Sequence, residues 1–224
     1  MAFKFPWSVK DSHRDDPYWD FFINTAPADL TNTVTELMRK APAGNIFPTK
    51  AELHTPEITA SHVKGMARYF GTELIGIVKL SSSETLSSRP QPPEADQPSA
   101  EAGEAYPEQS RRGKGEGPDI DLPFAILCAV HADYDPRISP GIGGQMPVQN
   151  GLFITFVLSA WIRELGFRAT VVRDADTDAL AAKAGLGTLN GRGRLVTREF
   201  GAGVYVADAI YTDLPLAADE PEAR

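Results

Sequence analysis

The chain has 224 residues, 42% of them hydrophobic, and its 30 acidic residues outnumber its 22 basic ones to give a net charge of −8. This length and composition allow one substantial buried core, and the negative charge argues against a protein that holds nucleic acid over a broad surface. The single cysteine, Cys128, excludes an internal disulfide and cannot by itself hold an iron–sulfur cluster, which needs about four ligands.

The start of the chain has none of the usual targeting patterns. Residues 1–8 contain no basic region followed by an apolar stretch, and no twin arginine. The longest apolar segment, residues 152–162, is shorter than the ~20 residues that span a bilayer. We therefore expect a cytoplasmic protein without membrane contacts.

Residues 1–55 are rich in aromatic side chains but show weak periodicity, and we interpret them as an arm or lid that packs on the core or on a second subunit. Residues 56–80 form the first part of the main domain. Apolar side chains at helical spacing predict a helix from Thr59 to Phe70, which Gly71 ends. The apolar run from Leu74 to Leu80 predicts a buried strand.

Residues 81–118 are rich in Ser, Pro, Glu, Gln and Gly and almost lack large apolar side chains. This composition is typical of disorder, so we predict a disordered surface insertion between two parts of one domain. The main part, residues 119–224, resumes with a buried strand at residues 124–130, in which Cys128 is expected to be a small buried side chain.

The rest of the chain alternates less regularly between helices and strands. A long packed helix is predicted from Pro147 to Leu165, then a strand at residues 167–172. Asp174 or Asp176 can cap an alanine-rich helix that ends at Lys183, and further strands are predicted at residues 195–197 and 204–211. This order is neither strict strand–helix alternation nor all-β, and it predicts an α+β sandwich.

The segment from Ala184 to Thr197, here called the glycine loop, contains four glycines and two arginines. Such a loop can bring backbone N–H groups and positive charge close to a phosphate or a carboxamide. It follows a helix and leads into a strand, the reverse of a dinucleotide-binding fingerprint, and it lacks the Lys-Ser or Lys-Thr pair of a triphosphate loop. The sequence therefore predicts a polar ligand here, outside both of those classes.

His131, Asp133 and Tyr134 lie at the end of the predicted strand 124–130. An imidazole, a carboxylate and a phenol are groups that proton transfer requires, although an Asp-rich turn at Asp135-Pro136 explains the same residues. The sequence contains no zinc-binding or serine-hydrolase motif, so no metal ligands are predicted among its side chains.

Several motifs together resemble the cobalamin-binding domain of reductive dehalogenases and epoxyqueuosine reductases. The resemblance rests on Ala184-Gly185-Leu186-Gly187, on the stretch from Thr197 to Gly201, and on Thr212-Asp213-Leu214-Pro215-Leu216, in matching order and spacing. Residues 162–167 and, more weakly, residues 67–76 also match.

This resemblance implies a nitroreductase-like α/β sandwich with a mixed, largely antiparallel sheet, binding a corrinoid without a protein side chain on cobalt. It implies Asp133 and Tyr134 as candidate catalytic residues, because an Asp-Tyr pair carries the proton donor in epoxyqueuosine reductases. The residues implied in cofactor binding are those of the glycine loop: Ala184, Gly185, Leu186, Gly187, Thr188, Asn190, Arg192 and Arg194. The basic residue of the glycine loop, Arg192, is displaced by one position from its place in the pattern of these families.

In these families cysteine-rich cluster motifs follow the Asp-Leu-Pro-Leu stretch, whereas no cysteine follows it here. We therefore expect a cluster-free corrinoid protein that either handles the corrinoid or reduces an unknown small molecule with electrons from an external donor, such as a ferredoxin or a flavoprotein. Two alternatives stay open. One is an FMN-dependent nitroreductase-like oxidoreductase, a class that usually forms homodimers, and the other is a non-catalytic corrinoid storage or sensing protein.

Overall fold

The computed structural model describes residues 17–30, 33–81 and 122–221. Residues 82–118 of the predicted insertion and residues 1–16 of the predicted arm therefore lie outside the described residues. The division of the chain into an arm, two domain parts and an insertion stays a prediction.

A central sheet is built around β2 (Phe124–His131), which pairs with β1 (Leu74–Lys79) along one edge. Along its other edge β2 pairs with β6 (Val204–Val206) and β7 (Ala209–Thr212), and β3 (Ala169–Val172) pairs with β7. Every pair between described strands is antiparallel. The α+β class with a largely antiparallel sheet is therefore confirmed.

The strand predicted over residues 204–211 is interrupted in the structure. Ala129 pairs with Val206 and Ile126 with Ile210, so β2 advances three residues while the opposite strand advances four. One extra residue in an antiparallel strand is a β-bulge, which bends the strand and turns a side chain out of the ladder. Ala207 still donates to the Cys128 carbonyl at 2.9 Å, and the bulge places Asp208 between β6 and β7.

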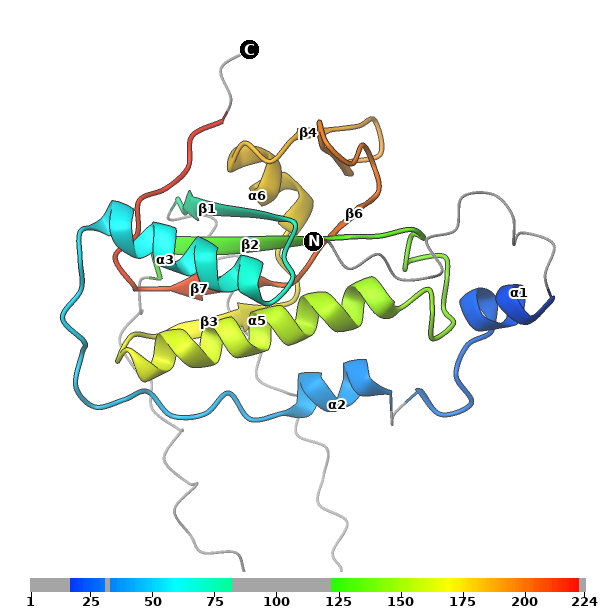
Figure 1. Cartoon of the computed structure of the whole chain (residues 1–224), viewed down its shortest axis with the longest axis horizontal. Coiled ribbons are helices and arrows are strands. Elements are labelled where there is room, and N and C mark those ends of the chain that lie inside the picture. Colours follow the sequence, from blue (N-terminus) through cyan, green and yellow to red (C-terminus); the bar gives the residue numbers. More distant parts are fainter. Residues whose placement is uncertain (1–16, 31–32, 82–121, 222–224) are drawn as a thin grey trace, which may run out of the picture.

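Helices cover both faces of the sheet (Figure 1). Because side chains alternate along a strand, Ile126, Cys128 and Val130 of β2 face one cluster, which contains residues of α3 (Pro56–Tyr69) and α5 (Met146–Glu164). The opposite face of β2 packs against α6 (Thr177–Lys183) and against the hairpin of β4 (Thr188–Leu189) and β5 (Leu195–Val196). The sheet is thus the middle of three layers.

The ends of two helices follow from their capping residues. Thr55 accepts a hydrogen bond from the Ile58 amide, so α3 begins at Pro56, earlier than the predicted Thr59. Of the two aspartates considered as the cap of α6, Asp176 takes the role by accepting from the Ala179 amide at 3.1 Å. The long predicted helix is α5, and no described helix is long and apolar enough to cross a membrane.

The described part of the arm packs on this same chain. The end of α1 (Pro17–Asn24) accepts hydrogen bonds from the amides of Gly141 and Gly143, just before α5. Helix α2 (Val34–Lys40) lies along α5, and Phe47 and Ala51 donate to carbonyls at the end of α5.

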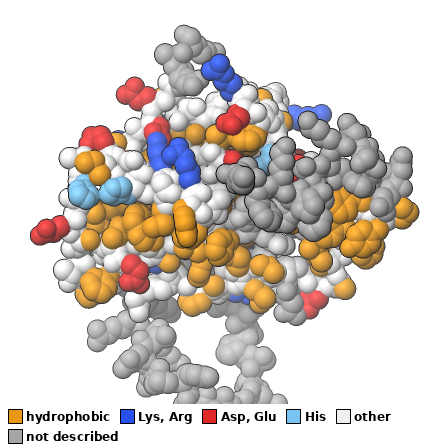
Figure 2. Space-filling model, viewed as in Figure 1, with side chains coloured by type: hydrophobic (Ala, Val, Ile, Leu, Met, Phe, Trp, Pro, Cys, Tyr) orange, Lys and Arg blue, Asp and Glu red, His pale blue; other side chains and the backbone are white. Residues whose placement is uncertain are grey.

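Figure 2 shows hydrophobic side chains gathered over α3 and α5 and over α1. The exposed large side chains on these helices include Tyr18 and Phe21 on α1 and Phe153 on α5. The possible homodimer stays a prediction.

Candidate functional site

A cleft of about 510 Å³ lies between the segment that follows β2 and the β4–β5 hairpin. Asp133 and Tyr134 line it from one side, and Asn190, Arg192 and Arg194 line it from the hairpin. The antiparallel sheet brings the two segments together, because β2 ends beside the start of β6 and the hairpin leads into β6. The structure thus joins two groups of residues that the sequence singled out for separate reasons.

Asn190 shapes the tip of the hairpin. Its side-chain oxygen accepts from the amides of Arg192 and Arg194, at 2.9 and 3.1 Å, and its own amide donates to the Arg194 carbonyl. Gly193 has a φ of +70°, a left-handed conformation that favours glycine. Asn190 therefore organises the backbone that presents the two arginines.

Five of the eight predicted cofactor residues do not line the cleft, and four of these five form the Ala-Gly-Leu-Gly motif. Ala184 and Leu186 pack on β1, where a Cβ on Gly76 would lie 2.5 Å from the Ala184 Cβ and 3.2 Å from the Leu186 Cγ. Gly185, at a φ of +78°, ends α6 as a left-handed cap, and its amide donates to the Ala182 carbonyl. A Cβ on Gly187 would lie 2.3 Å from the Val196 carbonyl oxygen.

The Ala-Gly-Leu-Gly motif is thus accounted for by helix capping and close packing. Thr188 follows it as an exposed residue of β4 and is also absent from the residues that line the cleft. Whether these five residues touch a cofactor stays a prediction.

Asp178 is a residue that the sequence reasoning missed, and it connects the parts of the cleft. Its side chain is only 10% exposed, and its two oxygens accept from three donors. One oxygen accepts from Arg137 at 3.2 Å and Arg194 at 3.3 Å, and the other accepts from the Leu195 amide at 3.1 Å. Asp178 therefore ties α6 to the hairpin and to the segment after β2. Its place in the first turn of α6 carried no sequence signal for this role.

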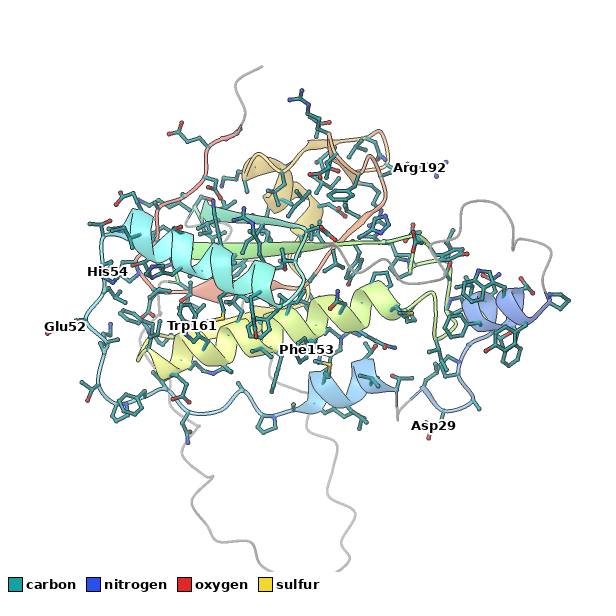
Figure 3. The ribbon with its side chains drawn as sticks, viewed as in Figure 1. Asp29, Glu52, His54, Phe153, Trp161 and Arg192 are labelled. Atoms are coloured by element: carbon teal, nitrogen blue, oxygen red, sulfur yellow. The ribbon has the colours of Figure 1, made fainter. Side chains whose placement is uncertain are left out.

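The two arginines of the hairpin differ in what their guanidinium groups contact. Arg194 is held by Asp178, whereas no described residue forms an ion pair with the Arg192 guanidinium. Arg192 lies at the exposed hairpin tip, and Figure 3 shows it across the sheet from Phe153 and Trp161 of α5. Arg192 is therefore the hairpin cation with its charge available to a ligand.

The segment after β2 positions the candidate acid–base groups. The His131 Nε2 lies 3.8 Å from an Asp133 carboxylate oxygen, and both side chains are about half exposed. Gln145, at the start of α5, donates to the carbonyls of Pro136 and Ser139 and so anchors the turn that follows. The Asp135-Pro136 turn foreseen from the sequence is present, because Asp135 accepts from the Arg137 amide at 3.0 Å.

Tyr134 is held by the N-terminal arm. The Trp19 indole donates to the Tyr134 hydroxyl oxygen at 3.1 Å, and the Trp19 ring stacks on Phe22. The hydroxyl proton of Tyr134 is not used in this contact, so the phenol keeps a donor for the cleft.

The other two motifs of the resemblance stabilise local structure. The Thr197 hydroxyl accepts from the Phe200 amide, and Thr197 and Gly201 exchange backbone hydrogen bonds, which closes a tight loop after β5. In the last motif, Leu214 is fully buried and Asp213 accepts from both the amide and the guanidinium of Arg168. These contacts give both motifs a role in folding, whatever they do in binding.

Comparison with known proteins finds no matching family model and no matching curated protein. Solved structures do match. The catabolic reductive dehalogenase NpRdhA matches with a TM-score of 0.61 and 20% identity, over 90% of this chain and 27% of that chain. A further reductive dehalogenase structure, described as suggesting a mechanism for B12-dependent dehalogenation, matches with a TM-score of 0.58, 20% identity and the same two coverages.

Epoxyqueuosine reductase from Streptococcus thermophilus shows a weaker similarity, with a TM-score of 0.44 and 14% identity over 73% of this chain and 48% of that chain. The two dehalogenase matches show that the chain has the fold found in reductive dehalogenases over most of its length. It spans about a quarter of the length of those dehalogenase chains.

Proposed function

We propose that this chain binds a corrinoid, with the polar part of the cofactor at the β4–β5 hairpin. The observation that carries the proposal is the cleft that unites the candidate proton donors with the hairpin arginines. The fold supports it, because a structure described in terms of B12-dependent dehalogenation shares this fold over 90% of the chain.

The residues of the cleft fit one part of such a cofactor. The Arg192 guanidinium has no ion-pair partner among described residues and suits a phosphate, and Asn190 presents backbone and amide groups beside it. A corrinoid is larger than this cleft, so most of it would lie outside. Room exists at the hairpin tip, where a Cβ on Gly191 or Gly193 would contact nothing within 4 Å.

Bound cobalamin would supply a strongly reducing cobalt centre. The chain would supply the proton: Asp133 is the proposed acid, and His131 is an ionisable neighbour whose Nε2 lies 3.8 Å from its carboxylate, beyond hydrogen-bond distance. Tyr134, oriented by Trp19, would donate a hydrogen bond to the reacting molecule. The half-exposed position of Asp133 leaves it accessible to a small substrate.

We further propose that the electrons come from a donor outside these 224 residues, such as a ferredoxin or a flavoprotein, since their single cysteine cannot hold an iron–sulfur cluster. The same site would serve a carrier that handles a corrinoid without chemistry. Replacing Asp133 separates these roles, because Asp133→Asn removes the acid while keeping the shape of the side chain. Under a strong artificial reductant, a catalytic protein would lose turnover on this change, whereas a carrier would keep its corrinoid affinity and show no turnover in either form.

The binding test is an absorption spectrum of the purified full chain after incubation with hydroxocobalamin or with FMN, followed by gel filtration. Co-elution of cobalamin with the protein at near-equal molar ratio is the expected result. Arg192→Gln should weaken this retention, and the exposed Arg198→Gln serves as the matched control. Retention of FMN alone would replace the corrinoid by the flavin alternative, and retention of neither would overturn the proposal.

A further inference from the structure

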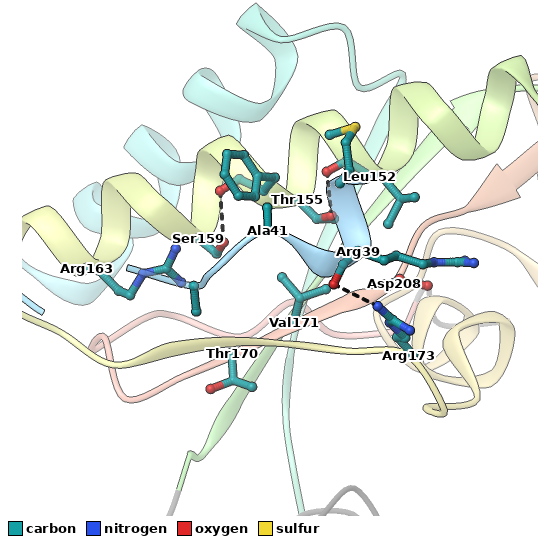
Figure 4. Close-up of a pocket in the computed structure, with 13 residues that line it drawn as sticks. Arg39, Ala41, Leu152, Thr155, Ser159, Arg163, Thr170, Val171, Arg173 and Asp208 are labelled. Atoms are coloured by element: carbon teal, nitrogen blue, oxygen red, sulfur yellow. Dashed lines mark hydrogen bonds between the residues drawn. The ribbon is translucent and has the colours of Figure 1, made fainter. Parts of the chain in front are cut away.

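A second cavity, of about 240 Å³, lies on the other face of the sheet, between α2, α5, β3 and the bulge that separates β6 from β7. It shares no lining residue with the cleft at the hairpin. Figure 4 shows Arg39, Arg173 and Asp208 at one end of this cavity and Arg163 at the other. The cavity is therefore a separate candidate binding site, and nothing in the proposed corrinoid function uses it.

Two buried polar atoms at one end of the cavity have no hydrogen-bond partner among the described residues. They are the Arg39 Nε, a donor, and the Asp208 Oδ2, an acceptor. Asp208 is only 8% exposed, so bulk water does not solvate its carboxylate freely. Leaving a buried donor and a buried acceptor unpaired is unfavourable, so a ligand that accepts from Arg39 and shares a proton with Asp208 gains on binding.

The charges at the cavity favour an anion. Three guanidinium groups, those of Arg39, Arg163 and Arg173, line it together with the carboxyl of Asp208, and Glu36, outside the lining, pairs with the Arg39 Nη1 at 3.4 Å. The Arg173 guanidinium donates to the Arg39 backbone carbonyl at 3.0 Å, and this hydrogen bond holds the two residues together beside Asp208. Arg163, 5% exposed, donates to the Ala169 carbonyl and is fixed in place at the far end.

The middle of the cavity is apolar. Leu152 and Phe156 of α5 and Val171 of β3 form its walls, and the hydroxyls of Thr155 and Ser159 are already bonded to carbonyls within α5. This arrangement suits a ligand with one polar head and a short hydrocarbon body.

We propose that this cavity binds a small organic carboxylate, with its carboxylate against Arg39, Arg173 and Asp208 and its hydrocarbon body along Leu152 and Val171. An amphipathic anion meets the excess of positive charge, the unpaired donor of Arg39 and the apolar walls at once. In the complex, Asp208 and the ligand carboxylate share one proton.

The environment of Asp208 suits that role. Burial raises the pKa of Asp208 above its usual value, and Asp174 raises it further, whereas Arg39 and Arg173 oppose the shift. Tyr205 of β6 is the other titratable neighbour, and its own pKa is raised by burial and by Asp208. If Asp208 and the ligand carboxylate share one proton, the complex takes up that proton when it forms. The ligand should therefore bind more tightly as the pH falls.

The test is isothermal titration calorimetry of the full chain with hexanoate, hexanamide and hexylamine as three probes of one length. Hexanoate should bind at least tenfold more tightly than hexanamide, and hexylamine should not bind. Hexanoate affinity should rise several-fold from pH 8 to pH 6. Arg173→Gln, a change at an exposed residue, should weaken hexanoate binding at least tenfold, while Arg198→Gln leaves it unchanged.

Asp208→Asn gives a second, independent readout, because its amide donates at every pH. This variant should bind hexanoate at pH 8 and lose the pH dependence, and a thermal melt checks that it is folded. The proposal fails if hexanoate does not bind at millimolar concentration, if hexanamide or hexylamine binds equally well, or if Arg173→Gln and Arg198→Gln behave alike. Hydroxocobalamin retention should be unaffected by Arg173→Gln, so failure here and failure of corrinoid binding are distinguishable.

Discussion

The Trp19 indole donates a hydrogen bond to the Tyr134 hydroxyl at 3.1 Å, across 115 residues of sequence. This contact joins helix α1 to the segment after β2, and it brings the N-terminal arm to the edge of the candidate site. It gives the arm a function that its aromatic composition alone did not specify.

The strength of this contact can be measured with a double-mutant cycle. Trp19→Phe and Tyr134→Phe each remove the hydrogen bond while keeping an aromatic ring, and the coupling between them should be about 0.5–1.5 kcal/mol. Urea denaturation of the wild type, both single variants and the double variant gives the coupling. Additive losses in the double variant would show that the contact contributes nothing to folding.

Asp178→Asn should destabilise the protein, because it removes the charge that pairs with Arg137 and Arg194 and leaves both guanidinium groups near a neutral amide. Since the two arginines are partly exposed, the loss should be about 1–3 kcal/mol, below that of a fully buried pair. Asp176→Asn on the same helix is the matched control, because asparagine also caps helices. Equal stability of the two variants in urea would remove Asp178 from its proposed connecting role.

The arginines of the hairpin should separate ligand binding from stability. Arg192→Gln should weaken hydroxocobalamin binding by about tenfold, the loss of one charge-assisted hydrogen bond, without changing the melting temperature. Arg194→Gln should lower the melting temperature because it breaks the contact with Asp178. Spectroscopic titration and thermal melts of both variants test this, and a fall in stability for Arg192→Gln would contradict the assignment.

Gly187→Ala should destabilise the protein by about 1–3 kcal/mol, because its Cβ would lie 2.3 Å from the Val196 carbonyl oxygen and would push β4 from β5. Gly191→Ala, in the same hairpin, meets nothing within 4 Å and should be nearly neutral. The two variants are compared by denaturant midpoint. A neutral Gly187→Ala would contradict this packing role of the glycine.

Stability should also depend on pH through Cys128. Burial raises the pKa of the Cys128 thiol to about 12, whereas an unfolded cysteine titrates at about 8.5. Above about pH 8.5 the unfolded chain loses this proton and the folded chain keeps it, so stability falls as the pH rises, by about 1.4 kcal/mol per pH unit.

Cys128→Ala removes this thiol and provides the control. Between pH 8 and pH 10 the wild type should lose about 2 kcal/mol more than the variant, measured by urea denaturation under reducing conditions. Parallel pH profiles of the two proteins would show that the thiol does not titrate on unfolding.

The sequence by itself determined the elements of the core. The helical spacing in residues 59–70 and 147–165 and the apolar runs at residues 74–80 and 124–130 each matched an observed helix or strand, because their periodicity reports which face is buried. The glycine loop and the Asp133-Tyr134 pair were also singled out from the sequence, and their functional roles stay predictions. The prediction of one continuous strand over residues 204–211 was wrong, because the bulge between β6 and β7 leaves no periodic signal in the sequence.

Only the tertiary structure decided how those pieces meet. Pairing of β6 with β2 places the hairpin beside Asp133, and no local pattern encodes that register. Asp178 and Arg192 share a cleft but differ in role, because one is buried among three donors and the other has no ion-pair partner among described residues. Contacts between distant segments are set by the packing of the whole chain, so roles that depend on them are not readable from residue types alone.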